Sequence, residues 1–226
     1  MTTLWSNRYE AWYRENSRDL NVFKEQHQYH TLDIQPGDVA LDLGGHIGAF
    51  ALMAAHAGAT QVVSYEPEPE NFELLLKNIE RYPQCSAVRA AVVASPAPKT
   101  VDFYVVVPPS GKKLNCSHSL FLSEKKSGTR WPRKKIMVTA VGIEEVLAEV
   151  KPTVIKSDVE GAEFMLFEKL ELPSGVRAIA IEMHYKEPGR AEAYRLADSL
   201  SRQGFLPSRI PYLGLNKFPT VGVWSR

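Results

Sequence analysis

The sequence predicts an α/β fold in which one open, doubly wound and mostly parallel sheet carries helices on both faces. Short apolar runs of strand length alternate with longer amphipathic runs, and glycine or acidic residues follow several of the strand-like runs. Alternation at this spacing requires parallel pairing through right-handed crossovers. The chain has 226 residues, 44% hydrophobic and 23% charged, so we expect a single globular domain over residues 1–226.

The first half of the chain supplies three strands and two helices after an N-terminal extension. Residues 1–35 are expected to be helical and peripheral, because Trp5, Tyr9, Trp12 and Tyr13 recur at helical spacing. After a turn at residues 36–38, apolar strands are expected at residues 39–43, 62–65 and 86–94. Helices are expected near residues 48–58 and 69–82, the second with an inward stripe of Phe72, Leu75, Leu76 and Ile79.

The second half repeats the alternation after an insertion. Residues 101–107 and 136–141 are rich in valine and are expected to pair as a β-hairpin, an insertion that spans residues 100–141. Strands are then expected at 153–156 and 178–183, helices at 160–170 and 188–203, and short terminal strands at 205–210 and 220–224.

Composition argues against several other classes of protein. No run approaches about 18 apolar residues, and the N-terminal residues lack the basic start and apolar core of a secretory signal. The two cysteines, Cys85 and Cys116, cannot form a disulfide framework and show no metal-binding spacing. We therefore expect a cytoplasmic protein without a membrane span.

The inserted hairpin concentrates positive charge. Eight basic residues and one acid, Glu124, lie between Pro108 and Lys135, whereas the whole chain has a net charge of only +1. Such a run is usually a solvated face. It is equally compatible with a rim that attracts an anionic acceptor, with Trp131 stacking on a ring or base.

Glycines and an acid follow the first two strands. Residues 42–48 fit the pattern D-x-G-x-x-x-G, with Asp42, Gly44 and Gly48, and glycine lets a backbone approach a ligand closely. Glu66 ends the next strand, where a carboxylate can accept two hydrogen bonds from a ribose diol. Glu66 as a helix cap is the structural alternative, and the spacing favours a nucleoside site.

The fourth parallel strand ends in the densest polar cluster of the chain. Lys156, Asp158, Glu160 and Glu163 surround Gly161, and helix capping accounts for only part of this set. The next strand ends with Glu182 and His184, which are two residues apart and therefore point to the same side. Ligands bind at this edge of such sheets, so these side chains are candidates for catalysis.

Together these residues resemble the FkbM-type family of S-adenosylmethionine-dependent methyltransferases. The resemblance covers about residues 38–185, and the run K-x-D-x-E-G-x-E at 156–163 is its most specific part. The residues that carry the resemblance are the segments 39–48, Tyr65-Glu66-Pro67 with Asn71 and Asn78, 156–163, and Ile181-Glu182-Met183-His184. The family implies the seven-stranded, Rossmann-like class I methyltransferase fold, with residues 220–224 as a final antiparallel strand. Gly45-His46 is a departure, because many relatives have alanine and asparagine there.

The resemblance implies a role for each candidate residue. Asp42 and the turn Gly44, Gly45, His46 and Gly48 would hold the methionine end of S-adenosyl-L-methionine. Glu66 would bind the ribose hydroxyls, and Pro67, Ala91 and Val92 would form walls for adenine. Asp158 would orient the cofactor amino group or the acceptor, beside Glu160.

Methyl transfer is an in-line displacement, so alignment and removal of the acceptor's proton are what a protein can contribute. His184 is the expected base, with Glu182 fixing its tautomer or holding substrate. The alternative is a divalent cation, Mg²⁺ held by Asp158 and Glu182, that lowers the pKa of an acceptor hydroxyl.

Three functions remain open at this point. We expect a methyltransferase that acts by O-methylation of a small-molecule, sugar or peptide acceptor, because the sequence motifs of the usual DNA methyltransferases are absent. A non-catalytic relative that binds RNA or an acidic partner through the basic hairpin is the second. An NAD-dependent oxidoreductase is the third, and Leu43 opposes it because a dinucleotide fingerprint needs glycine at that position.

Overall fold

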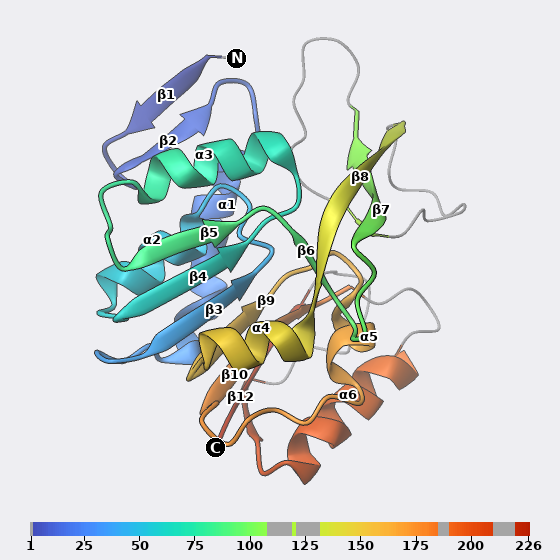
Figure 1. Cartoon of the computed structure of the whole chain (residues 1–226). Coiled ribbons are helices and arrows are strands. Elements are labelled where there is room, and N and C mark those ends of the chain that lie inside the picture. Colours follow the sequence, from blue (N-terminus) through green and yellow to red (C-terminus); the bar gives the residue numbers. More distant parts are fainter. Residues whose placement is uncertain (1, 108–118, 121–131, 185–189, 210–219) are drawn as a thin grey trace.

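A seven-stranded sheet forms the centre of the molecule (Figure 1). The computed structural model describes residues 2–107, 119–120, 132–184, 190–209 and 220–226. The strand order in the sheet is β11-β12-β10-β9-β3-β4-β5. The strands are β3 (Val39–Leu43), β4 (Gln61–Tyr65), β5 (Cys85–Val88), β9 (Val154–Ser157), β10 (Ala178–Met183), β11 (Leu206–Arg209) and β12 (Thr220–Ser225).

The direction of the strands is that of the predicted fold. β3, β4, β5, β9 and β10 pair in parallel, and β12 runs antiparallel to both β10 and β11. The chain proceeds from β3 outward to β5 on one side, and β9 begins the other side. The strand order therefore reverses between β3 and β9, which is where such sheets bind ligands.

Helices cover both faces of this sheet, and the side chains on each face pack into a separate hydrophobic core. On one face, Leu41, Leu43 and Ile155 pack with α4 (Ile143–Val150), α5 (Glu163–Phe167) and α6 (Arg190–Arg202). On the other face, Ala40, Val62 and Val154 pack with α2 (Ala49–His56), α3 (Pro69–Ile79) and the 3₁₀ helix η1 (Gln26–Leu32). Alternate residues of one strand serve different cores because successive strand side chains point to opposite faces.

The N-terminal extension differs from the expectation. Residues 3–14 form a β-hairpin, β1 (Thr3–Ser6) and β2 (Ala11–Arg14), and helix begins only with α1 (Asp19–Glu25) and η1. Trp5 pairs with Trp12 across the hairpin, and their ring centroids are 5.4 Å apart. The spacing of these aromatic residues suits cross-strand pairing as well as one helical face, so the pattern alone could not separate the two.

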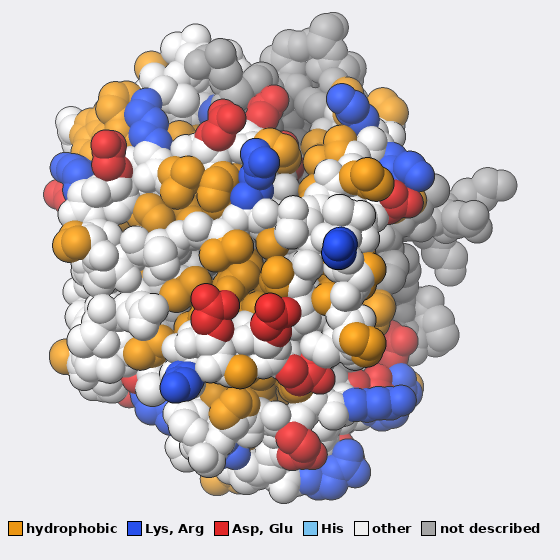
Figure 2. All heavy atoms as spheres, in the orientation of Figure 1, with side chains coloured by type: hydrophobic (Ala, Val, Ile, Leu, Met, Phe, Trp, Pro, Cys, Tyr) orange, Lys and Arg blue, Asp and Glu red, His pale blue; other side chains and the backbone are white. Residues whose placement is uncertain are grey.

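The segment predicted as a single strand at 86–94 is two strands in two sheets. β6 (Ala91–Val93) leaves the main sheet after β5 and pairs with β8 (Arg133–Gly142). β8 also pairs antiparallel with β7 (Thr100–Val106), which confirms the predicted hairpin. Most of the basic connection between β7 and β8 lies outside the described residues. Figure 2 shows basic side chains at the surface over the outer end of β7 and β8.

Two helices also differ from the prediction. α4 was not predicted, although Ile143, Val146, Leu147 and Val150 form a helical apolar stripe. α5 begins at Glu163 rather than at Glu160, because Glu160 and Gly161 have left-handed backbone angles, φ +52° and +107°.

The hairpin β1–β2 is held to α3 by buried polar contacts. Arg14 and Asp19, each at most 1% exposed, form an ion pair at 2.8 Å, and Arg14 also donates to Asn71 Oδ1 at 2.7 Å. Asn78 accepts from the Trp12 N–H at 2.6 Å and donates to the Ile47 carbonyl at 2.8 Å. The extension is thereby tied to the loop that follows β3.

Within the described part of the chain, no helix is both long and apolar enough to cross a membrane.

Candidate active site

A cavity of about 430 Å³ opens where the carboxyl ends of β3, β4, β9 and β10 meet, at the predicted reversal of strand order. It brings together most of the residues singled out from the sequence. The lining includes Gly44, Gly45, His46, Glu66, Pro67, Ala91, Val92, Asp158, Glu160, Glu182 and His184. Asp42 and Gly48 are not part of the lining. Asp42 is fully buried behind the wall, and Gly48 is the N-cap of α2.

The turn after β3 presents backbone to the cavity. The N–H groups of Gly44 and Gly45 both donate to the Tyr65 carbonyl, at 3.0 and 2.9 Å. Gly44 has φ +81°, and a Cβ at this position would lie 1.9 Å from the backbone oxygen of Asp158. No other residue fits at position 44, because this contact is with backbone and cannot move aside as a flexible side chain would.

Glu66 lies on the cavity wall, 5% exposed, and each of its oxygens accepts one backbone N–H. Oε2 accepts from His46 at 2.8 Å and Oε1 from Glu68 at 2.8 Å. Burial raises the pKa of Glu66 to about 8, although both backbone hydrogen bonds act in the opposite direction. The helix cap is Glu68, which accepts from the Asn71 N–H, so Glu66 is not needed for that purpose.

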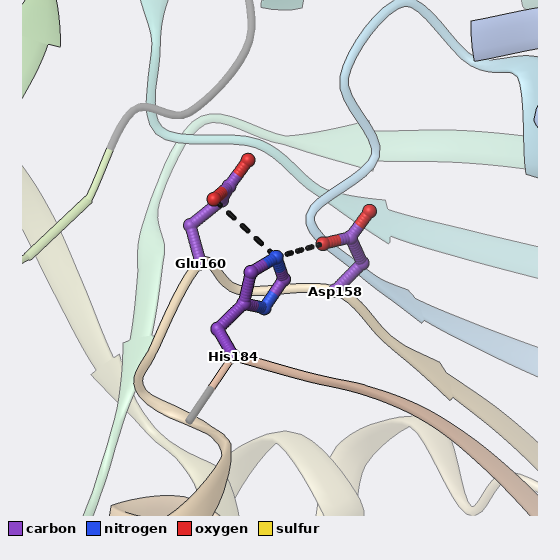
Figure 3. Close-up of side chains that lie close together, drawn as sticks. All are labelled: Asp158, Glu160 and His184. Atoms are coloured by element: carbon purple, nitrogen blue, oxygen red, sulfur yellow. Dashed lines mark ion pairs between the residues drawn. The ribbon is translucent and has the colours of Figure 1, made fainter. Parts of the chain in front are cut away.

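Four acidic side chains surround His184 at the opposite wall, and Figure 3 shows two of them, Asp158 and Glu160, beside the ring. The ring Nδ1 lies 2.7 Å from Glu163 Oε1, and Glu163 is fully buried. Nε2 lies 3.4 Å from Glu160, 3.9 Å from Asp158 and 4.0 Å from Glu182. The ring is therefore held by a buried carboxylate on one side and faces three carboxylates on the other.

The environment of His184 acts on its protonation. Burial lowers the pKa of the imidazole, but the hydrogen bond to Glu163 and the charges of Glu163, Glu160 and Asp158 outweigh it and raise the pKa well above 6.5. The protonated ring is therefore favoured, and this form cannot accept a proton from a substrate. The role of His184 as the base stays a prediction.

The acidic wall also contains a carboxyl with a raised pKa. Burial and the neighbouring charge of Asp158 raise the pKa of Glu182 to about 8, against the opposing charge of His184. Glu182 Oε2 accepts a hydrogen bond from the Tyr29 hydroxyl at 2.9 Å. A hydrogen bond with Asp158 also raises the pKa of Glu182.

Sequence reasoning missed several residues of the cavity. One whole wall comes from α1, η1 and the residue before them: Arg18, Asn21, Val22, Glu25, Gln26, Gln28 and Tyr29. No motif marks this wall, because its residues meet the strand ends only in the folded chain. Lys156 also lines the cavity. It belongs to the polar run that begins at the end of β9, and its position in that run is the signal by which the sequence could have identified it as a site residue.

The described residues contain one group suited to a metal ion. Single ligand atoms of Asp158, Glu160 and His184 lie within 4.8 Å of one another. Carboxylate oxygens and an imidazole nitrogen suit a divalent cation, and such acidic groups are also common without one.

The fold is that of class I methyltransferases. The chain resembles the crystal structure of *Aeropyrum pernix* fibrillarin with natively bound S-adenosyl-L-methionine, with a TM-score of 0.50 and 12% identity over 99% of this chain and 81% of that one. For a precorrin-6y C5,15-methyltransferase from *Geobacter metallireducens* GS-15, the TM-score is 0.49 at 10% identity, over 91% and 87% of the two chains. These likenesses concern the fold.

The sequence comparison defines the family. The family model of the methyltransferase FkbM domain matches residues 42–207, so the chain belongs to the FkbM methyltransferase family. It is 37% identical over 70 residues to the 31-O-demethyl-FK506 methyltransferase FkbM of *Streptomyces tacrolimicus*. That match spans 30% of this chain and 26% of the relative. The resemblance inferred from the strand-end motifs is confirmed.

The raised pKa of Glu66 predicts that Glu66→Gln changes how the stability of the protein depends on pH. The folded protein keeps the Glu66 proton up to about pH 8, whereas the unfolded chain releases it near 4.5, so this group's contribution to stability falls as pH rises between these values. Glutamine does not titrate, and only one of its two terminal atoms can accept an N–H, so the variant loses one backbone contact at every pH. Thermal unfolding should therefore show the stability of the variant relative to the wild type rising between pH 5 and pH 8.5.

The same variant should bind S-adenosylhomocysteine roughly tenfold or more weakly, since an amide replaces the charged acceptor of the ribose hydroxyls. Calorimetry across pH 6.5–8.5 should show wild-type affinity rising with pH and a flat response in Glu66→Gln. Equal affinity in both proteins would exclude the ribose assignment.

Proposed function

We propose that this protein is an S-adenosyl-L-methionine-dependent methyltransferase that carries out O-methylation of a small-molecule, sugar or peptide acceptor. The observation that carries the proposal is one cavity with two chemically different walls. Glycine backbone and Glu66 lie on one wall, and Asp158, Glu160, Glu182 and His184 lie on the other.

The first wall fits the donor. The turn at Gly44 and Gly45 lets a ligand approach the backbone, as the methionine end requires. Each oxygen of Glu66 has accepted only one backbone N–H among its described contacts, so each has a lone pair left for a ribose hydroxyl. Pro67, Ala91 and Val92 supply the apolar surface for adenine. When bound, S-adenosyl-L-methionine supplies a methyl group made electrophilic by its sulfonium.

The second wall fits the removal of a proton from the acceptor. We assign Glu182 as the base, because it lies beside Asp158 and is held by the Tyr29 hydroxyl. With a pKa of about 8, Glu182 takes the acceptor's proton in its ionised form, so methyl transfer should become faster as the pH rises towards 8. The imidazolium of His184, fixed by Glu163, compensates the charges of Glu160 and Asp158. Alignment of the two reactants by both walls can contribute roughly 7–11 kcal/mol, and a positioned base adds about 10²–10⁴-fold.

Calorimetry separates this function from its alternatives. We expect binding of S-adenosylmethionine and S-adenosylhomocysteine and none of NAD. Isotope-labelled donor, incubated with fractionated pools of sugars, lipids, peptides and RNA, should then label an acceptor fraction. Binding of NAD alone would indicate an oxidoreductase. Salt-dependent RNA binding without donor binding would indicate a non-catalytic module.

Glu182→Gln tests whether Glu182 is the base. The variant should transfer label to the accepting fraction about 10²–10⁴-fold more slowly, with the affinity for S-adenosylhomocysteine unchanged, since a carboxamide cannot take a proton. Glu144→Gln, on the exposed first turn of α4, is the matched control and should keep the full rate. A full rate in Glu182→Gln would mean that the base lies elsewhere.

A divalent cation at the acidic wall is the second candidate. The clustering of Asp158, Glu160 and His184 favours it, and so does the contact of Nδ1 with Glu163, which leaves Nε2 facing the carboxylates. These three residues would supply the ligand atoms, and the cation would neutralise the acidic wall. Chelation with EDTA followed by Mg²⁺ or Mn²⁺ decides the matter: lost and restored methyl transfer supports a cation, and unchanged transfer contradicts it.

A further inference from the structure

Lys156 places a buried ammonium beneath the donor wall. It lies on β9 directly beside Asp42 of β3, and its side chain is 4% exposed. Nζ lies 3.0 Å from Asp42 Oδ1 and donates to the Gly44 carbonyl at 2.6 Å. The other oxygen of Asp42 accepts the Ser64 hydroxyl at 2.9 Å, so the carboxylate is held from both sides.

Stability alone does not explain this ion pair. Removing two charges from water costs several kcal/mol per ion, and apolar residues of similar volume often stabilise a protein as well or better. Apolar residues, however, cannot donate a hydrogen bond to the Gly44 carbonyl. Burial lowers the pKa of Lys156, but the charges of Asp42, Asp158 and Glu182 raise it above its usual value, so the side chain stays a cation.

The Gly44 turn has hydrogen-bond partners from two directions, an acceptor on β4 and a donor on β9. Its N–H groups, at Gly44 and Gly45, are satisfied by the Tyr65 carbonyl of β4. Its carbonyl, at Gly44, is satisfied by Lys156 from β9. His46, in the same turn, has φ +48°, and a residue other than glycine keeps a left-handed backbone only when its surroundings fix it. Lys156 also reaches the cavity wall, where the rings of Tyr29 and Phe50 lie 5.8 and 6.0 Å from Nζ.

We propose that Lys156 is a positioning residue of the donor site, which fixes the Gly44 turn by donating to its carbonyl while Asp42 holds the ammonium in place. The inference rests on the proposed function, because the turn is assigned to the methyl donor. The opposing hypothesis is a structural ion pair, in which only the charge balance of Lys156 and Asp42 matters.

A pair of double variants separates the two hypotheses. Asp42→Asn/Lys156→Met and Asp42→Asn/Lys156→Gln both remove both charges, and methionine and glutamine have side chains of similar length. Only glutamine keeps an N–H donor for the Gly44 carbonyl. Neither variant leaves an uncompensated buried charge, so both should unfold at similar temperatures.

The measurement is the affinity for S-adenosylhomocysteine by calorimetry, beside thermal unfolding. We expect the methionine variant to bind about tenfold or more weakly than the wild type, the loss of one charge-assisted hydrogen bond, and the glutamine variant to recover part of that loss. Wild-type affinity in the methionine variant, or equal losses in both, would overturn the inference.

Two single variants keep the test decisive if the double variants do not fold. Lys156→Gln keeps an N–H donor for the Gly44 carbonyl and Lys156→Met does not, while both leave the same Asp42 charge, so the glutamine variant should bind S-adenosylhomocysteine more tightly than the methionine variant. Equal affinity in these two variants would contradict the inference. Absence of binding in the wild type would instead refute the proposed function, so the two failures are distinguishable.

Discussion

The backbone contact between Gly44 and Asp158 is the constraint on which the rest of the site depends. The turn after β3 and the loop after β9 lie so close that no side chain fits between them, and the Asp158 N–H donates to the Leu43 carbonyl at 2.9 Å. This approach brings the two strand ends on either side of the reversal into one cavity. Glycine on one wall and acids on the other therefore face the same space.

Two basic side chains of the site are held in the same way. Lys156 is backed by Asp42 and His184 by Glu163, and both carboxylates are fully buried and absent from the cavity lining. Each buried acid fixes one basic side chain, which then faces the cavity. Because the anchoring carboxylates are out of water, their attraction for positive charge is screened less than it would be at the surface. The acidic wall thus faces basic groups in fixed positions.

The central sheet and its strand ends could be predicted because apolar runs, glycines and the polar run 156–163 are local signals. The N-terminal hairpin could not, because the spacing of Trp5, Tyr9 and Trp12 fits a helix as well as paired strands. The state of His184 depends on Glu163, which is 21 residues distant, and Tyr29 meets Glu182 across 153 residues. Such contacts leave no periodicity in the sequence. α4 is different: it was not predicted, although its buried apolar stripe has helical spacing and is a local signal in the sequence.

The N-terminal extension before β3 determines which recombinant fragments of this chain keep the cavity and the core intact. The family match begins at residue 42, whereas Arg14, Asp19 and Tyr29 lie before it. A recombinant fragment trimmed to the matched region would lose β1, β2, α1, η1 and most of β3, and it would uncover the apolar side chains of Leu52 and Leu74, which pack in one cluster with Ala11 and Phe23. A fragment with these boundaries would expose apolar surface, tend to aggregate and lack one wall of the cavity. Expression should therefore start near residue 1.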